Sequence, residues 1–155
     1  MTRTERRYRP GTLVLETDFE TADGLVRVVD FMPRREGPPQ VMRIVEGLRG
    51  RVLMRMELRP RFDYGAIAPV VEPRVDGAAA YVGADALHLS TPVELTLADR
   101  SLRAEFAVPE GARERFVMSW HPSWEGAPPA DWPIFMASSW YGIGLSRSSL
   151  VNHWV

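Results

Sequence analysis

The side chains in this sequence that could take part in catalysis or bind a metal are its carboxylates and its three histidines. His88, His121 and His153 are too widely spaced for a recognisable zinc motif. Cysteine is absent, which removes thiolate metal ligands, cysteine nucleophiles and disulfides from consideration. Serine is frequent, but no Gly-x-Ser-x-Gly segment presents it as a nucleophile. The sequence therefore predicts no metal site, no cofactor and no catalytic residue in this chain.

Two acidic residues stand out by their neighbours. Asp63 lies between two aromatic residues, where it could contact another domain or a sugar, or could bond to Arg61 or to turn amides. The second, structural interpretation is favoured. Asp30 ends an apolar run and is expected to face inward beside Thr17, as a buried, hydrogen-bonded acid at the end of a strand.

The elements that must position these residues are β-strands, because the dominant sequence period is two. Apolar and polar residues alternate from Thr12 to Thr21, and Asp23-Gly24 then favours a tight turn into a return strand from Leu25 to Met32. The pairs expected from a two-residue loop are Ala22 with Leu25, Phe19 with Val28 and Glu20 with Arg27. This register places apolar residues on one face and opposite charges on the other.

A second hairpin is expected from Val41 to Arg59, with its turn near Arg49-Gly50. Further short strands are expected at Ala79–Val82, Ala86–Ser90, Val93–Leu97, Ser101–Val108 and Arg113–Trp120, separated by Gly, Pro and Asp. This spacing predicts an all-β, antiparallel β-sandwich with little helix. The stretch between Gly65 and Pro73 is predicted to be irregular.

Composition limits the functional classes. The chain has 155 residues, 45% of them hydrophobic, which fits one globular domain. The net charge is −1, so no overall field attracts nucleic acid or an anionic membrane, and neither is expected as a partner. All 19 basic residues are arginine. The charged N-terminus and the lack of cysteine favour a cytoplasmic location.

Residues 131–155 differ in character from the rest. They hold three of the five Trp, five Ser and just one Arg. We therefore divide the chain into residues 1–130, an incomplete β-sandwich domain, and residues 131–155, a divergent tail.

Several segments, in order, resemble one known family. They are residues 8–17 (Tyr-Arg-Pro-Gly-Thr-Leu-Val-Leu-Glu-Thr), 19–24 (Phe-Glu-Thr-Ala-Asp-Gly), 28–33 (Val-Val-Asp-Phe-Met-Pro), 43–46 (Arg-Ile-Val-Glu), 49–50 (Arg-Gly), 60–65 (Pro-Arg-Phe-Asp-Tyr-Gly) and 116–122 (Phe-Val-Met-Ser-Trp-His-Pro). This series resembles the trehalase-like N-terminal domain of glycoside hydrolase family 15, over roughly residues 8–126.

The resemblance implies a specific role. Family members join an N-terminal β-sandwich to an α/α-barrel that hydrolyses α-glucosidic bonds with paired glutamates. This chain resembles the sandwich without its first strands and without the barrel. We therefore expect a non-catalytic accessory domain that supports a barrel partner, and the residues expected at the interface between them are Arg61, Asp63, Tyr64, Trp120 and His121.

Two other functions remain open. The chain could be a free-standing carbohydrate-binding module that binds α-glucosides through aromatic rings, although Trp120 is expected mainly in the core. It could also be a gene fragment without an independent role. Whichever function holds, sheet edges left open by the missing first strands predict poor solubility or self-association of the isolated chain.

Overall fold

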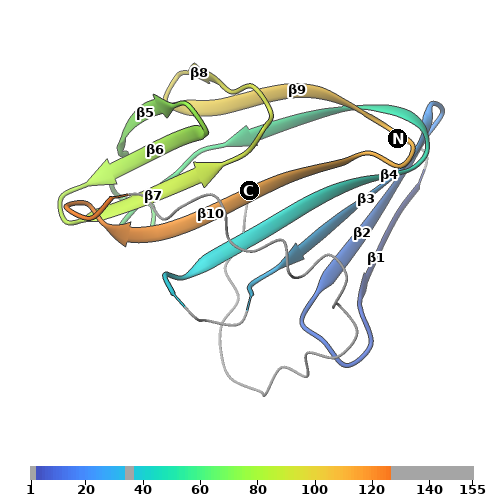
Figure 1. Ribbon diagram of the computed structural model, residues 1–155, viewed down its shortest axis with the longest axis horizontal. Helices are drawn as coiled ribbons and strands as arrows, with labels where there is room; N and C mark the ends of the chain where they lie inside the picture. Colours follow the sequence, from blue (N-terminus) through green and yellow to red (C-terminus); the bar gives the residue numbers. More distant parts are fainter. Residues whose placement is uncertain (1–2, 34–36, 127–155) are drawn as a thin grey trace.

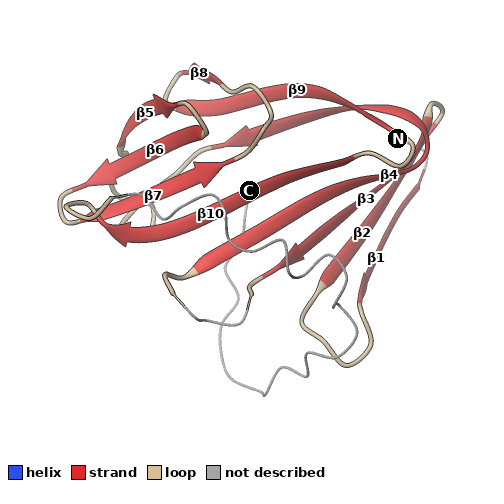
Figure 2. Ribbon diagram, in the orientation of Figure 1, coloured by secondary structure: helices blue, strands red, loops and turns tan. Residues whose placement is uncertain are grey.

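The computed structural model describes residues 3–33 and 37–126, which form an all-β structure (Figures 1 and 2). The strands are β1 (Arg3–Tyr8), β2 (Leu15–Thr21), β3 (Gly24–Phe31), β4 (Gln40–Leu58), β5 (Val70–Arg74), β6 (Gly77–Val82), β7 (Asp85–Ser90), β8 (Thr96–Ala98), β9 (Ser101–Pro109) and β10 (Arg113–Pro122). Every strand pair is antiparallel. No helix in these two ranges is long and apolar enough to cross a membrane.

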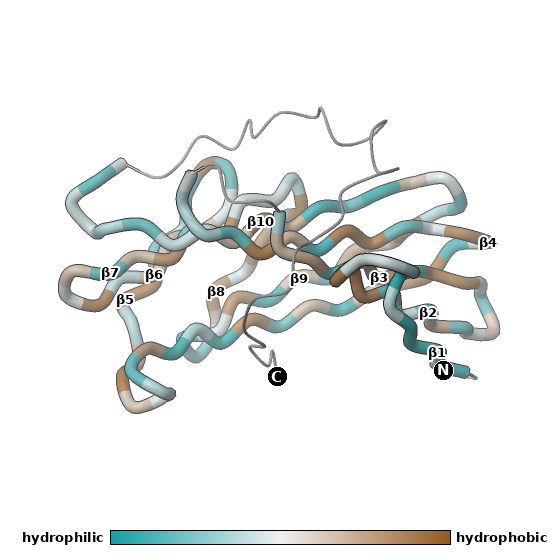
Figure 3. The backbone as a smooth tube through the Cα atoms, turned by 90° about the horizontal axis from the view of Figure 1, so that it is seen from below, coloured by the Kyte–Doolittle hydropathy of each residue, from teal (hydrophilic) through white to brown (hydrophobic). Residues whose placement is uncertain are grey.

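The strands form two layers that share β4. The main layer has the strand order β1-β2-β3-β4-β10-β7-β6-β5, and the second layer is β4-β9-β8. The sheet does not close on itself in the described residues. Figure 3, which views the molecule from below, shows one layer above the other. The antiparallel all-β sandwich predicted from the sequence is confirmed.

The core lies between the two layers. Val26, Val28 and Val45 of the main layer pack with Val52 and Val108 of the second layer. The rings of Phe116 on β10 and Phe106 on β9 also approach each other across the layers, with their centroids 5.6 Å apart. Alternate residues of the central strands therefore fill the core, as the two-residue period requires.

The first predicted hairpin is present, but its register is wrong by two residues. Thr21 pairs with Gly24, so the turn consists of Ala22 and Asp23 and not of Asp23 and Gly24. Phe19 consequently lies opposite Val26. A shift of two keeps every side chain on its predicted face, so the separation of apolar and charged residues remains correct.

The second predicted hairpin is wrong. Residues 40–58 form one continuous strand, β4, which passes from the main layer into the second layer. Gly50 does have a positive φ of 69°, but it marks the point where β4 changes layer and not a reversal of the chain. The apolar residues after Gly50 pair with β9, about 50 residues later, and not with the first half of β4.

The other strands match their predicted positions with three differences. β8 (Thr96–Ala98) overlaps the predicted Val93–Leu97 strand only at Thr96 and Leu97. β5, in the stretch predicted to be irregular, is a strand despite Pro73. β1 was not predicted either, and it forms the edge beside β2. The predicted tail, residues 131–155, lies outside the described residues.

Candidate functional site

Three of the predicted interface residues, Arg61, Asp63 and Tyr64, lie together in a tight turn between β4 and β5. Phe62 pairs with Ile67 across this turn, and the backbone is left-handed at Asp63 and Tyr64, with φ of 49° and 53°. The side chain of Tyr64 is fully exposed. The guanidinium of Arg61 donates to the carbonyl oxygen of Pro60 (3.1 Å) and not to Asp63.

The other two predicted interface residues point in opposite directions from β10. Trp120, expected mainly in the core, is instead 38% exposed, and its indole N–H donates to Oδ1 of Asp85 on β7 (2.8 Å). His121 is buried, and its Nδ1 donates to the carbonyl oxygen of Pro122 (2.9 Å). Because successive side chains of a strand face opposite sides of a sheet, at most one of the two can share a surface with the Tyr64 turn.

Asp30 lies on the predicted face of β3 and is hydrogen-bonded, as expected, but its neighbour and its burial differ from the prediction. It lies opposite Leu15 and not beside Thr17, and its side chain is one-quarter exposed. Its carboxylate accepts two hydrogen bonds from the guanidinium of Arg43 on β4, at 2.7 and 3.0 Å. This bidentate ion pair links β3 to β4, so the carboxylate has a structural role.

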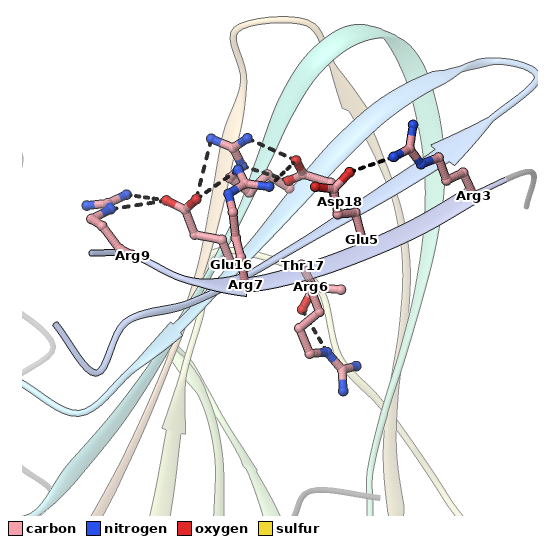
Figure 4. Close-up of polar contacts among 9 residues, drawn as sticks. Arg3, Glu5, Arg6, Arg7, Arg9, Glu16, Thr17 and Asp18 are labelled. Carbon is pink, nitrogen blue, oxygen red and sulfur yellow. Dashed lines mark hydrogen bonds and ion pairs between the residues drawn. The ribbon is translucent and has the colours of Figure 1, made fainter. Parts of the chain in front are cut away.

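The largest polar cluster in the described residues is an ion-pair network on the outer face of β1, β2 and β3. We call it the outer-face network, and its members are Arg7, Arg9, Glu16, Asp18 and Arg27. Figure 4 shows Arg7 and Arg9 reaching from the β1 side toward the carboxylates on β2, while Arg6 points to the other face, where it contacts Thr17. The strand alternation of β1 thus sorts its arginines between two faces.

Glu16 lies at the centre of this network. Nη2 of Arg9 lies 2.7 Å and Nη2 of Arg7 lies 2.9 Å from its carboxylate oxygens, and Nη1 of Arg27 lies 3.9 Å away. Asp18 accepts hydrogen bonds from Arg27 at 2.7 and 3.0 Å and from Arg7 at 3.0 Å. The Glu16 side chain is only 7% exposed, so this carboxylate depends on its arginine partners for solvation.

The network lowers the pKa of both acids. Burial raises the pKa of Glu16, but the hydrogen bond from Arg9 and the charges of Arg27, Arg9 and Arg7 outweigh it, and the net pKa lies below its ordinary value. The pKa of Asp18 is lowered chiefly by its hydrogen bond from Arg27. Both acids are therefore held ionised. An ionised carboxylate suits a structural ion pair, but it has no proton to donate as a general acid.

A second polar cluster lies on the same outer face, across β4, β10 and β7. Gln40 pairs with Ser119, and Ser119 pairs with His88, so three buried polar residues form one row. His121 is two residues further along β10. Oε1 of Gln40, Nδ1 of His88 and Nε2 of His121 are buried without a hydrogen-bond partner in the part of the chain that the structure describes.

His88 makes stability depend on pH. Burial lowers the pKa of His88, and Asp76, whose Oδ2 lies 3.3 Å from Nε2, opposes this only in part. Since the folded pKa lies below the unfolded value of 6.5, the folded state binds fewer protons than the unfolded chain. The contribution of neutral His88 to the free energy of unfolding is therefore complete above pH 6.5, and it is lost progressively as the pH falls below that value.

We expect the thermal unfolding midpoint to decrease as the pH is lowered from about 7.5 to about 5.5, a range in which ordinary carboxylates stay ionised. The variant His88→Gln should flatten this dependence. Asp76→Asn should steepen it, because Asp76 is the group that favours protonation of His88. Scanning calorimetry of the three proteins across this range is the measurement. An unchanged slope in His88→Gln contradicts the assignment.

The described residues contain no group of three or more His, Cys, Asp or Glu side chains that could hold a metal ion. Sequence reasoning missed most of the outer-face network, although one signal was present. Acids alternate with other residues at positions 16, 18 and 20, and Arg27 was expected to face one of them. The arginines of β1 were not connected to these acids, because β1 itself was not predicted.

No protein-family model matches this chain, and no curated protein matches it either.

Proposed function

We propose that this chain is a non-catalytic accessory β-sandwich domain of a glucoamylase- or trehalase-like glycoside hydrolase, which docks to an α/α-barrel acting on α-glucosides. One observation carries the proposal: the segments that resemble the family meet in space. Residues 8–17, 28–33, 43–46 and 116–122 fall on neighbouring strands of the main layer.

Contacts between these segments are specific. Asp30 and Arg43, from two of them, form the bidentate ion pair that joins β3 to β4. Gly24 and Gly50, from two others, pair where β3 and β4 approach each other. A Cβ at Gly24 would overlap the carbonyl oxygen of Arg49 on β4, and a Cβ at Gly50 would overlap that of Asp23 in the turn before β3. Segments that contact one another fit the framework of one folded domain, which is what the resemblance implies.

The state of the carboxylates also supports a non-catalytic role. Hydrolysis of a glycosidic bond needs one carboxyl with a raised pKa to protonate the leaving oxygen. Glu16 and Asp18 have lowered pKa values, and Asp30 and Glu46 are bonded to Arg43 and Arg113. These acids therefore support the sheet.

The test is association with a barrel. The purified chain should form a 1:1 complex with an α/α-barrel catalytic domain of the glucoamylase or trehalase type that has been prepared without its own sandwich. Tyr64→Ala should weaken the complex by about tenfold or more if the exposed ring is an interface anchor. Tyr8→Ala, which removes another exposed tyrosine on β1, is the matched control and should have little effect.

Calorimetric titration measures the affinity, and a glucose-release assay with maltose, trehalose and dextrin measures activity. The chain alone should release no glucose. Two results contradict the proposal: the lack of any complex at concentrations of tens of micromolar, or glucose release by the chain that one carboxylate substitution abolishes.

The exposure of two tryptophans favours a second candidate function, a carbohydrate-binding module. Trp120 is 38% and Trp124 is 74% exposed, and the Trp120 indole is oriented by Asp85. Such rings can stack on sugars. Titration with maltose or trehalose, followed by tryptophan fluorescence, separates the two candidates: a saturable change that Trp120→Ala abolishes favours the binding module.

A further inference from the structure

The second half of β4 has one unpaired edge. Residues 51–58 pair with β9 on one side, and in the described residues they have no strand on the other. The backbone N–H of Arg51 donates away from β9, to the carbonyl oxygen of Asp23 (3.2 Å), whereas the carbonyl oxygen of Gly50 accepts from Glu110 at the end of β9 (2.8 Å). Backbone groups alternate sides along a strand, so Leu53, Arg55 and Glu57 direct theirs toward the unpaired edge.

The other strands that end the two layers carry features that discourage pairing. β1 has four charged residues among six, β5 contains Pro73, and β8 has only three residues. Charge, proline and short length are the usual means by which proteins protect sheet edges. Residues 51–58 are eight in number and contain no proline, and their three charged residues alternate with apolar ones. Leu53 among them is 70% exposed.

The strand β9 shows which chemistry matches this half of β4. On the inner face, Val52, Met54, Met56 and Leu58 of β4 meet Val108, Phe106, Ala104 and Leu102 of β9. On the outer face Arg55 pairs with Glu105 (2.7 Å) and Glu57 pairs with Arg103 (3.1 Å). A strand on the open side would face the same alternation, apolar inside and charged outside.

We propose that residues 51–58 bind an extended segment of a partner polypeptide, which adds to the second layer as an antiparallel strand. The segment carries apolar residues at alternate positions, and between them a carboxylate opposite Arg55. Main-chain hydrogen bonds to Leu53, Arg55 and Glu57 provide the affinity, and the charge on Arg55 sets the register. This binding is independent of the proposed glycoside-hydrolase role.

A second copy of the chain fits this edge less well than a single segment does. Pairing two copies edge to edge would place both main layers on the same side of the joined second layer. The main layer already extends past this edge through β3, β2 and β1 (Figure 1), so the two main layers would collide. A single extended segment brings no main layer with it, so this collision does not arise.

The probe is a fluorescent peptide with the sequence of β9, residues 101–109, which already matches β4 in pattern. Anisotropy titration of the full chain should give saturable binding, and a scrambled peptide should not bind. Leu53→Pro removes one edge N–H and should weaken binding by about tenfold. Leu53→Ala is the matched control: it keeps the N–H and should bind nearly as well as the unchanged chain.

Charge exchange keeps the test informative if Leu53→Pro does not fold. Arg55→Glu should weaken binding of the peptide, and a peptide with arginine in place of Glu105 should restore it. Hydrogen exchange gives a second readout, since amides of Leu53, Arg55 and Glu57 should exchange quickly in the free chain and slowly with peptide. Equal binding of the scrambled peptide, or slow exchange at these amides in the free chain, overturns the proposal.

Discussion

Replacing Gly50 by alanine should destabilise the protein by about 3 kcal/mol, because one substitution incurs two separate penalties. Gly50 has a φ of 69°, which alanine adopts only at a cost. A Cβ at this position would also overlap the carbonyl oxygen of Asp23 in the turn between β2 and β3. That carbonyl accepts the N–H of Arg51, so it cannot move away without losing a hydrogen bond where β4 changes layer.

Gly111 separates the two penalties. It has a similar φ of 78°, but a Cβ there would meet no atom within 4 Å. Gly111→Ala should therefore cost only the conformational part, about 1 kcal/mol. Urea unfolding of both variants measures the difference. Equal losses in the two variants would show that the close approach to Asp23 has no energetic weight.

The strands could be predicted where the information was local. Alternation identified β2 and β3, and turn residues at regular spacing identified β6, β7, β9 and β10. The register of the first hairpin was wrong because Asp23-Gly24 was interpreted as a turn pair. Gly24 is instead required by the approach of Arg49, whose carbonyl oxygen leaves no room for a Cβ. That contact joins residues 25 positions apart, and no local pattern carries it.

The continuous strand β4 was missed for a related reason. Arg49-Gly50 carries the composition of a turn, and the apolar residues on both sides permit a hairpin. Whether residues 51–58 fold back or continue the strand depends on which segment pairs with them. The segment that does so is β9, which is equally apolar and carries matching charges. Sequence alternation identifies the faces of a strand, but it does not identify the neighbour.

The polar clusters show the same limit. Alternating acids on β2 indicated a charged face, but the acid that lies opposite Arg27 is Asp18 and not Glu20 as predicted. The burial of Glu16 depends on β1 and β3 lying on either side, which local pattern did not show. The row of Gln40, Ser119 and His88 joins three strands that are far apart in sequence. Each of these residues looks like an ordinary surface residue until the strand order is known.

The outer-face network leads to the second large effect. Glu16→Gln should destabilise the protein by about 2–3 kcal/mol, because an uncharged amide leaves Arg7 and Arg9 without their buried partner. The control is Glu5→Gln, which breaks the ion pair between Glu5 and Arg3 within β1. The Glu5 side chain is 54% exposed, so its loss should cost less than about 0.5 kcal/mol.

The effect of Glu16→Gln should also depend on pH in a defined direction. The folded pKa of Glu16 lies below the unfolded value of 4.5, so the stabilisation by its carboxylate is complete above pH 4.5 and is lost as the pH falls through the folded pKa. The difference in unfolding free energy between the unchanged chain and Glu16→Gln should therefore be largest near pH 7 and should shrink toward pH 3. Urea unfolding at several pH values measures it. A difference that stays constant with pH would mean that Glu16 stabilises the sheet by packing, and that its charge has no part in holding β1 to the edge of the main layer.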